Sequence, residues 1–206
     1  MSFIDCISRL YDSLLTKKTP LKVPITDNSW QQFIFKMGLR ESSNDYSAIN
    51  PYGYLGRFQF GLARLSDFGM CTRLDPKSKS YRNEAFGWDF GFEQDDFLLN
   101  TVVQDRIFEA HVLRHVKRIK SAYKEYLGTS VHGTNIMLSG VVACFHLLGE
   151  GGFRHFIQGE NTSDANGTMA SDYLQDFYGY YIPGNLRDIT KAEIDLLVFT
   201  ERQSRP

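Results

Sequence analysis

The most constraining feature of the sequence is a helical repeat that runs from Asp95 to Leu127. Apolar side chains recur there at intervals of three or four residues, and Gly128 follows the last of them. This spacing places apolar side chains on one face of a helix, and a glycine commonly ends a helix. The pattern predicts one long helix or two shorter ones, around which a mainly helical domain can pack.

Other stretches show the same spacing and predict further helices. They cover residues 3–15, 30–40, 62–68, 136–148, 153–158, 171–178 and 191–200. Residues 27–29 supply candidate N-caps for the second of these, and Thr134 or Asn135 supplies one for 136–148. Thr190 and Glu193 have the spacing of a capping box that opens the last helix. The fold class predicted is therefore mainly α.

Two segments lack helical spacing and interrupt the helices. Residues 42–61 are rich in Ser, Asn, Gly and Tyr and predict a loop with at most a short hairpin. Residues 72–94 form a long irregular excursion, which in a compact domain is often functional. Prolines near both ends divide the chain into an N-terminal helix and linker (1–25), a central domain (26–182) and a C-terminal helical extension (183–206).

Charge and composition exclude several classes of protein. The 23 basic and 24 acidic residues give a formal charge of −1, so no overall field attracts nucleic acid or an anionic membrane. No apolar run is long enough to predict a membrane span. Asp5, Arg9 and Asp12 interrupt the N-terminal helix where a signal peptide would be apolar, so we expect synthesis in the cytoplasm without a signal peptide. The three cysteines form no CxxC pair, which disfavours zinc ribbons and predicts free thiols.

The pattern that indicates chemistry begins with the pair Glu41-Ser42. Gly53 follows Glu41 after twelve positions and opens the sequence GxxGxxQ, completed by Gly56 and Gln59. This arrangement resembles the lysozyme-like superfamily, and in particular its lytic transglycosylases and their phage-type relatives. Those enzymes cleave the glycan strands of peptidoglycan.

Two later blocks extend the resemblance over roughly residues 28–180. The segment 143–152, ACFHLLGEGG, is similar to the end of a helix in the phage-type relatives, although Leu148 replaces a glycine of their pattern. The segments Asp164–Thr168 and Ser171–Leu174 are similar to their closing DANGT and SDYL elements. The resemblance implies a lysozyme-like helical domain with an irregular or short β-hairpin segment after the catalytic helix, and it implies no cofactor or metal.

Glu41 is the residue that the resemblance marks as catalytic, and its predicted setting agrees with that role. An acid that cleaves a glycosidic bond must still hold its proton near neutral pH. Glu41 falls at the predicted C-terminal end of a helix, where the negative end of the helix dipole disfavours a second negative charge. Apolar neighbours such as Phe33, Met37 and Phe58 would remove it from water and raise its pKa further.

The remaining candidates are expected to bind or position the substrate. Gly53 and Gly56 have no Cβ, so the backbone there could approach a sugar closely. Gln59 offers a donor and acceptors for an N-acetyl group or a hydroxyl. Tyr173 matches a tyrosine that faces the catalytic carboxyl in the relatives, although a core tyrosine is an equal alternative. His146 matches a histidine of their pattern, but a packing role is favoured for it.

Ser42 and a second carboxylate complete the predicted site. Ser42 is expected to hydrogen-bond near the acid, and Asp45, Asp164 and Asp172 are the candidates for the second carboxylate. A hydrolase needs such a pair at a defined separation. A lytic transglycosylase needs only the acid, because a hydroxyl of the substrate attacks the anomeric carbon within the same molecule. The resemblance modestly favours the transglycosylase.

Weaker signals leave alternatives open. The basic run in residues 114–124 could meet anionic polymers of the cell wall but is more often a solvated helix face. The aromatic run 86–92 could stack on sugars or form a local core. Residues 162–173 lack the acidic end ligands of a calcium loop, so we predict no metal there. The chain could also be a glycan-binding or host-directed module without turnover, or a hydrolase of chitin.

The predicted partner is therefore the peptidoglycan glycan strand. Because this substrate lies outside the cytoplasm, a chain without a signal peptide would need delivery by a phage lysis or tail system or by a secretion machine.

Overall fold

The computed structural model describes residues 29–89, 91–164 and 167–204, so the helix predicted over residues 3–15 lies outside the described residues. The described chain is mainly helical, as the sequence predicts, with two small antiparallel hairpins. In chain order its elements are α2 (Trp30–Ser42), α3 (Leu62–Ser66), β1 (Cys71–Arg73), η1 (Asn83–Ala85), β2 (Phe86–Trp88), α4 (Gln94–Leu98), α5 (Thr101–Ala122), η2 (Lys124–Tyr126), β3 (Ser130–Val131), β4 (Thr134–Asn135), α6 (Leu138–Ile157), α7 (Ala170–Asp176) and α8 (Lys191–Ser204).

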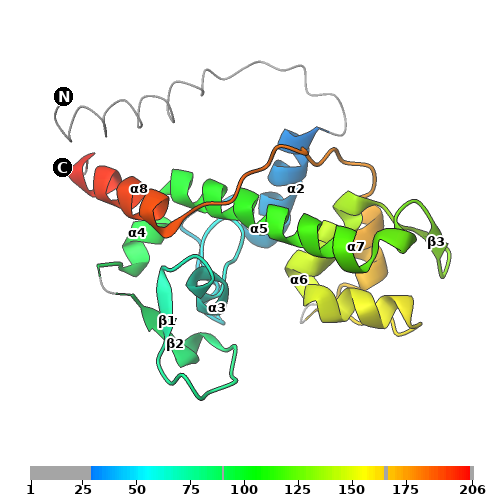
Figure 1. Ribbon diagram of the computed structural model, residues 1–206, viewed down its shortest axis with the longest axis horizontal. Helices are drawn as coiled ribbons and strands as arrows, with labels where there is room; N and C mark the ends of the chain where they lie inside the picture. The colour runs from blue at the N-terminus through cyan, green and yellow to red at the C-terminus, as the bar shows by residue number, and fades with distance from the viewer. Residues whose placement is uncertain (1–28, 90, 165–166, 205–206) are drawn as a thin grey trace.

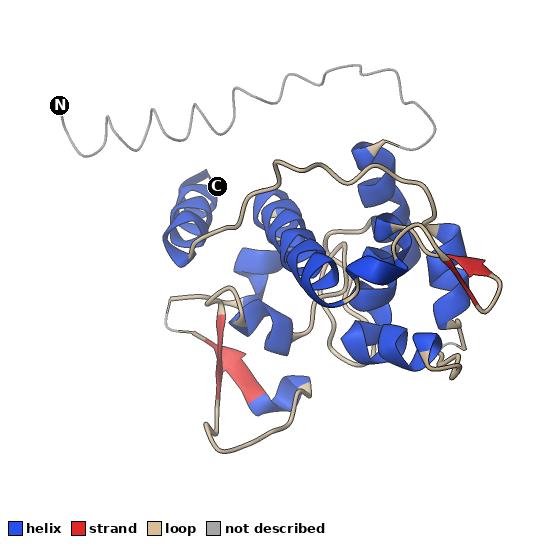
Figure 2. Cartoon of the chain, turned by 45° about the vertical axis from the view of Figure 1, so that its right-hand side comes forward, coloured by secondary structure: helices blue, strands red, loops and turns tan. Residues whose placement is uncertain are grey.

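Helix α5 runs through the middle of the molecule (Figure 1). The hairpin β1–β2 and helix α3 lie toward the N-terminal end of α5, and α6, α7 and the hairpin β3–β4 lie toward its C-terminal end (Figure 1 and Figure 2). Helix α8 contacts α4 and α5 at the N-terminal end of the central helix. Helix α2 and the loop after it lie between these two groups of elements (Figure 1).

The core is built from aromatic side chains on α2, α5 and the loop that follows α2. Phe58 stacks on Phe108 with ring centroids 3.9 Å apart, and Phe33 packs beside Phe108 at 6.5 Å. All three rings are essentially inaccessible to water. A buried aromatic side chain removes a large apolar area from water, so these contacts hold the loop against the two helices.

Most predicted helices are present, and the central repeat is divided into two helices, one of the two arrangements predicted for it. The pattern over residues 95–127 becomes a short helix, α4, and a long one, α5. The break lies at Asn100, whose side chain accepts a hydrogen bond from the Val103 N–H at 3.0 Å and caps α5. The capping box of α8 is confirmed, since Thr190 and Glu193 exchange backbone-to-side-chain hydrogen bonds.

The prediction for the start of α6 is wrong. Thr134 and Asn135 do not cap this helix, because they form β4 and pair with β3. The N-cap is Met137. The predicted end is confirmed: Gly149, with φ +70° and ψ 177°, is not helical and ends the first helical stretch, and a second stretch continues to Ile157 where a short helix was predicted.

The strands also differ from expectation. Residues 42–61 contain no strand, only isolated bridges that join Leu55 to Ile49 and to Phe60. The hairpin β1–β2 lies in the segment expected to be an irregular excursion, with Thr72 opposite Gly87. Strands of three residues are too short to show an alternating pattern in the sequence.

Three smaller expectations can be compared with the described residues. Cys71 and Cys144 are buried free thiols, as predicted. None of the described helices combines the length and apolar character needed to cross a membrane. The C-terminal helix packs on the domain through buried Ile194, Leu197 and Val198, and Asn100 donates a hydrogen bond to the Leu197 carbonyl at 3.2 Å.

Candidate active site

Helix α2 carries Glu41 in its last turn. The helix begins at Ser29, whose hydroxyl accepts a hydrogen bond from the Gln32 N–H at 3.3 Å. It ends with Ser43 in the left-handed region at φ +58°, where the Ser43 and Asn44 N–H groups bond back to carbonyls of the last turn. The caps predicted around residues 27–29 and the helix itself are thus confirmed, and they fix the backbone of Glu41.

The Glu41 carboxyl is largely buried, and its Oε1 atom has no hydrogen-bond partner in the described part of the chain. Burial raises the pKa of Glu41 to about 8, although the Arg40 guanidinium opposes this rise; the Asp164 carboxylate adds to it. A buried polar atom without a partner is rare in folded proteins and asks for an explanation. One explanation is that the protonated Glu41 carboxyl forms its hydrogen bond to a ligand atom.

Glu41 opens into a cleft of about 660 Å³. The walls come from the end of α2, the loop 50–59, α6 and the residues Asp164, Thr168 and Tyr173. The lining residues are Arg40, Glu41, Asn50, Pro51, Tyr52, Gln59, Leu147, Asp164, Thr168 and Tyr173. The cleft therefore brings together four of the predicted residues, Glu41, Gln59, Asp164 and Tyr173. Its volume is in the range of ligand-binding clefts.

Tyr173 and Asp164 both line this cleft and are hydrogen-bonded to each other. The Tyr173 phenol donates a hydrogen bond of 2.5 Å to Asp164 Oδ2, and the Arg40 guanidinium lies 4.4 Å from the centre of its ring. Burial, followed by the bond to Asp164, raises the pKa of Tyr173 to about 12, so the phenol stays protonated. Tyr173 is almost fully buried but still lines the cleft. Its hydroxyl orients the carboxylate of Asp164.

The three candidate second carboxylates have different surroundings. Asp164 lines the cleft, where its other oxygen accepts the Thr168 N–H at 2.9 Å. Asp45 accepts hydrogen bonds from the backbone and hydroxyl of Ser47, and it is exposed. Asp172 accepts the Met169 N–H at 3.0 Å and so caps α7. Only Asp164 among them lies beside the acid.

The glycines of the GxxGxxQ segment shape the loop that forms one wall. Both have positive φ, +76° at Gly53 and +72° at Gly56, which favours glycine. A Cβ at Gly56 would lie 2.2 Å from Oε1 of Gln104, and one at Gly53 would lie 3.1 Å from the Asn83 amide. The need for glycine at these positions thus comes from neighbouring side chains of the protein, and neither glycine lines the cleft.

Gln104 is a site residue that the sequence did not reveal. It is fully buried on α5, accepts the Arg57 N–H at 2.8 Å and donates to the carbonyls of Tyr46 and Phe97 at 2.9 Å each. One amide therefore fastens the loop 46–57 to the central helix. A glutamine inside the apolar repeat of α5 was the available signal, but its partners are far away in sequence.

Ser42 and Gln59 use their side chains to brace the same loop. The Ser42 hydroxyl donates to the Arg57 carbonyl at 2.9 Å, so it joins the end of α2 to the loop and lies outside the cleft lining. The Gln59 side chain donates to the Gly56 carbonyl at 2.9 Å, and its backbone has φ +49°. Gln59 still lines the cleft, where its amide oxygen can accept a hydrogen bond.

His146 lies behind the cleft wall in a row of histidines. Its Nε2 is 3.1 Å from the Phe58 carbonyl, and its Nδ1 is 2.9 Å from Nε2 of His111, which in turn is 2.8 Å from Nε2 of His115. A carbonyl can only accept, so Nε2 of His146 carries the proton and Nδ1 accepts from His111. Burial is the main cause that lowers the pKa of all three imidazoles. The packing role favoured for His146 matches this position, and the neighbouring Leu147 lines the cleft instead.

Within residues 29–89, 91–164 and 167–204, no group of three or more His, Cys, Asp or Glu side chains is placed to hold a metal ion. Comparison with models of protein families, with curated proteins and with solved structures finds no match to this chain. The geometry of the cleft and the motifs in the sequence are therefore what indicates the function of this chain.

Proposed function

We propose that this chain is a peptidoglycan-cleaving enzyme of the lysozyme-like type, with Glu41 as its general acid and then its general base. The bond cleaved is the β-1,4 linkage between N-acetylmuramic acid and N-acetylglucosamine. The observation that carries the proposal is the unpaired, buried carboxyl of Glu41 at a cleft, with its pKa raised to about 8. The order of the motifs along the sequence supports the same assignment.

In the first step Glu41 protonates the oxygen of the departing sugar. A carboxyl with a pKa of about 8 keeps its proton at neutral pH, so the proton is available for the glycosidic oxygen when the bond breaks. Once deprotonated, the carboxylate accepts a proton from the hydroxyl that attacks the anomeric carbon. Proton transfer by one positioned group typically contributes about 10²- to 10⁴-fold in rate.

The attacking hydroxyl is proposed to be the C6 hydroxyl of the muramic residue, which gives a 1,6-anhydro product. Asp164 is the one candidate nucleophile beside Glu41, but each of its oxygens already accepts a hydrogen bond, from Tyr173 and from Thr168. These bonds hold its negative charge in place and reduce its nucleophilicity. Asp164 is therefore assigned to stabilising positive charge at the anomeric carbon, and attack within the substrate needs no protein nucleophile.

The test is digestion of purified sacculi by the wild type, Glu41→Gln and Glu125→Gln. Glu125 is an exposed glutamate on η2 and serves as the matched control. We expect Glu41→Gln to lose activity by at least about 10²-fold and the control to keep it. Equal activity of Glu41→Gln and wild type would refute the assignment of the acid.

The products and the substrates separate the remaining alternatives. Mass spectrometry of released muropeptides distinguishes the two reactions, because a hydrolase product contains one more water than the anhydro product. Binding of the wild type to sacculi without any product would instead favour a glycan-binding module that lacks turnover. Cleavage of chitin in preference to sacculi would favour a chitin hydrolase.

A further inference from the structure

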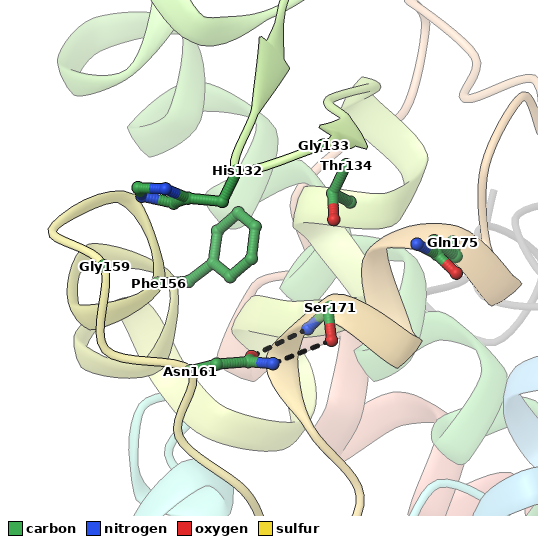
Figure 3. A pocket seen from close by; sticks show the side chains of 8 residues that line it. All are labelled: His132, Gly133, Thr134, Phe156, Gly159, Asn161, Ser171 and Gln175. Carbon is green, nitrogen blue, oxygen red and sulfur yellow. Dashed lines mark hydrogen bonds between the residues drawn. The ribbon is translucent and has the colours of Figure 1, made fainter.

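We propose that a second hollow, on the side of α7 away from the cleft, binds one residue of a neutral N-acetylated saccharide. The hollow has a volume of about 320 Å³ and lies between the hairpin β3–β4, the end of α6 and α7 (Figure 3). Ser171 and Gln175, four residues apart, lie on the face of α7 that lines it, whereas Tyr173 lies on the opposite face and lines the cleft. The two sites are therefore separate.

Thr134 supplies the first argument for a ligand. This residue is only 4% exposed, and its hydroxyl points into the hollow (Figure 3). Among the described residues this hydroxyl has no hydrogen-bond partner, and it remains accessible from the hollow. A hydroxyl that faces an open hollow without a protein partner is free both to donate and to accept a hydrogen bond. A ligand hydroxyl or amide that enters the hollow would pair with it.

Asn161 and Ser171 supply a second polar wall that is already rigid. The side-chain Nδ2 of Asn161 donates to the Ser171 hydroxyl at 2.9 Å, and the backbone N–H of Ser171 donates to the side-chain Oδ1 of Asn161 at 3.2 Å (Figure 3). The Ser171 hydroxyl therefore keeps its own proton to donate, and Asn161 keeps a second N–H. A ligand would meet polar groups whose positions are fixed before it binds, which reduces the entropy lost on binding.

Two aromatic rings form the opposite wall. The rings of His132 and Phe156 meet edge to face with centroids 5.8 Å apart. His132 and Gly133 occupy the turn of the hairpin β3–β4 with φ of +49° and +79°, so the histidine takes a left-handed conformation that is uncommon outside glycine. Positive φ at both positions is typical of a tight two-residue hairpin turn. Here the turn holds the exposed imidazole at the rim of the hollow.

The character of the lining selects the ligand class. None of the described lining residues is an Asp, Glu, Lys or Arg, in contrast to the cleft, where Arg40, Glu41 and Asp164 meet. A phosphate or a carboxylate would find no opposite charge to pair with. Hydroxyls and amides beside an aromatic wall suit a neutral sugar. The choice of an N-acetylated sugar over a plain hexose rests on the proposed function, whereas the saccharide class does not.

The experiment uses the full chain with Glu41→Gln, so that the ligand is not consumed. Chitotriose, a neutral N-acetylated trisaccharide, is titrated while the backbone amide shifts of Gly133 and Gly159 report on the hollow and that of Thr168 reports on the cleft. Thr134→Val removes only a hydroxyl, and Gln175→Ala changes an exposed side chain that folding does not need. Gln158→Ala, an exposed glutamine outside the hollow, is the matched control for Gln175→Ala.

We expect Thr134→Val and Gln175→Ala each to weaken binding at the hollow by about fivefold, the effect of one hydrogen bond, with no change for Gln158→Ala. Cellotriose, which lacks the acetamido groups, should bind more weakly. The site is refuted if the Gly133 and Gly159 amides do not respond to chitotriose, or if neither variant changes the affinity. Equal binding of cellotriose refutes the preference for an N-acetylated sugar. None of these results depends on turnover, which the sacculus assay tests separately.

Discussion

The phenol of Tyr173 donates a 2.5 Å hydrogen bond to Asp164 Oδ2, and both residues line the cleft that contains Glu41. The ring of Tyr173 is also held in place by the Arg40 guanidinium, which lies over it 4.4 Å from the ring centre. Asp164 in turn contributes to the raised pKa of Glu41. The three side chains thus act together: the tyrosine holds the aspartate, and the charge of the aspartate helps the glutamate to keep its proton.

Tyr173→Phe is expected to lower kcat by about tenfold and to change KM little. The variant keeps the ring under Arg40 but removes the hydrogen bond to Asp164, so the carboxylate loses its fixed position near the reacting carbon. Steady-state kinetics on soluble glycan fragments measures both constants. A variant that raised KM and left kcat unchanged would show instead that the phenol binds the substrate directly.

Asp164→Asn is expected to move the alkaline limb of the kcat/KM profile to lower pH. That limb reports the pKa of Glu41 in the free enzyme, which is about 8, and the Asp164 charge is one cause of its rise. Removing the negative charge makes ionisation of Glu41 easier, so activity would be lost at a lower pH. Asp172→Asn, which changes an aspartate that caps α7 and lies outside the cleft lining, is the control and should leave the limb in place. An unmoved limb in Asp164→Asn would contradict the coupling.

The sequence predicts the helices of this protein better than it predicts the connections around the site. Helix α2 and its acid follow from local signals: an apolar face, a serine cap and the position of Glu41 in the last turn. The hairpin β3–β4 was missed because its strands are two residues long, and Thr134 was assigned to a helix cap as a result. Gln104 and Asn83 hold the loop 46–59 from distant segments, and no local pattern marks such partners.

Gly56→Ala tests the role assigned to Gln104. Alanine is strained at φ +72°, and its Cβ would lie 2.2 Å from Gln104 Oε1. Gly128→Ala is the matched control, because Gly128 has φ +82° with nothing within 4 Å of its Cβ position. Both variants bear the left-handed penalty of about 1 kcal/mol, and we expect Gly56→Ala to lower the free energy of unfolding by about 1–3 kcal/mol more. Urea denaturation measures the difference, and equal losses would show that Gln104 moves aside without cost.

Glu41→Gln is expected to stabilise the fold, and more so as the pH rises. The folded pKa of Glu41, about 8, lies above its ordinary value of 4.5, so the folded chain binds a proton that the unfolded chain has already lost between these pH values. Stability is therefore greatest below pH 4.5 as far as this group is concerned and falls as the pH rises through 8. The neutral amide lacks this loss, which amounts to a few kcal/mol. Thermal unfolding at pH 5 and pH 8.5 checks it: a Tm difference between variant and wild type that did not grow with pH would contradict a buried acid.

Acid should destabilise the wild type through the row of histidines behind the cleft. Burial lowers the pKa of His146 to about 4 and that of His115 to about 3, from an ordinary value of 6.5. The unfolded chain then binds protons that the folded chain excludes, so stability is full above pH 6.5 and is lost as the pH falls toward 4 and 3. His146→Gln keeps a side chain that can donate to the Phe58 carbonyl but cannot become charged, so its free energy of unfolding should fall less steeply from pH 6.5 to 4. His132→Gln, at an exposed histidine, is the control and should leave the dependence of the free energy of unfolding on pH unchanged. Equal pH dependence for wild type and His146→Gln would show that His146 takes up its proton without opening the core.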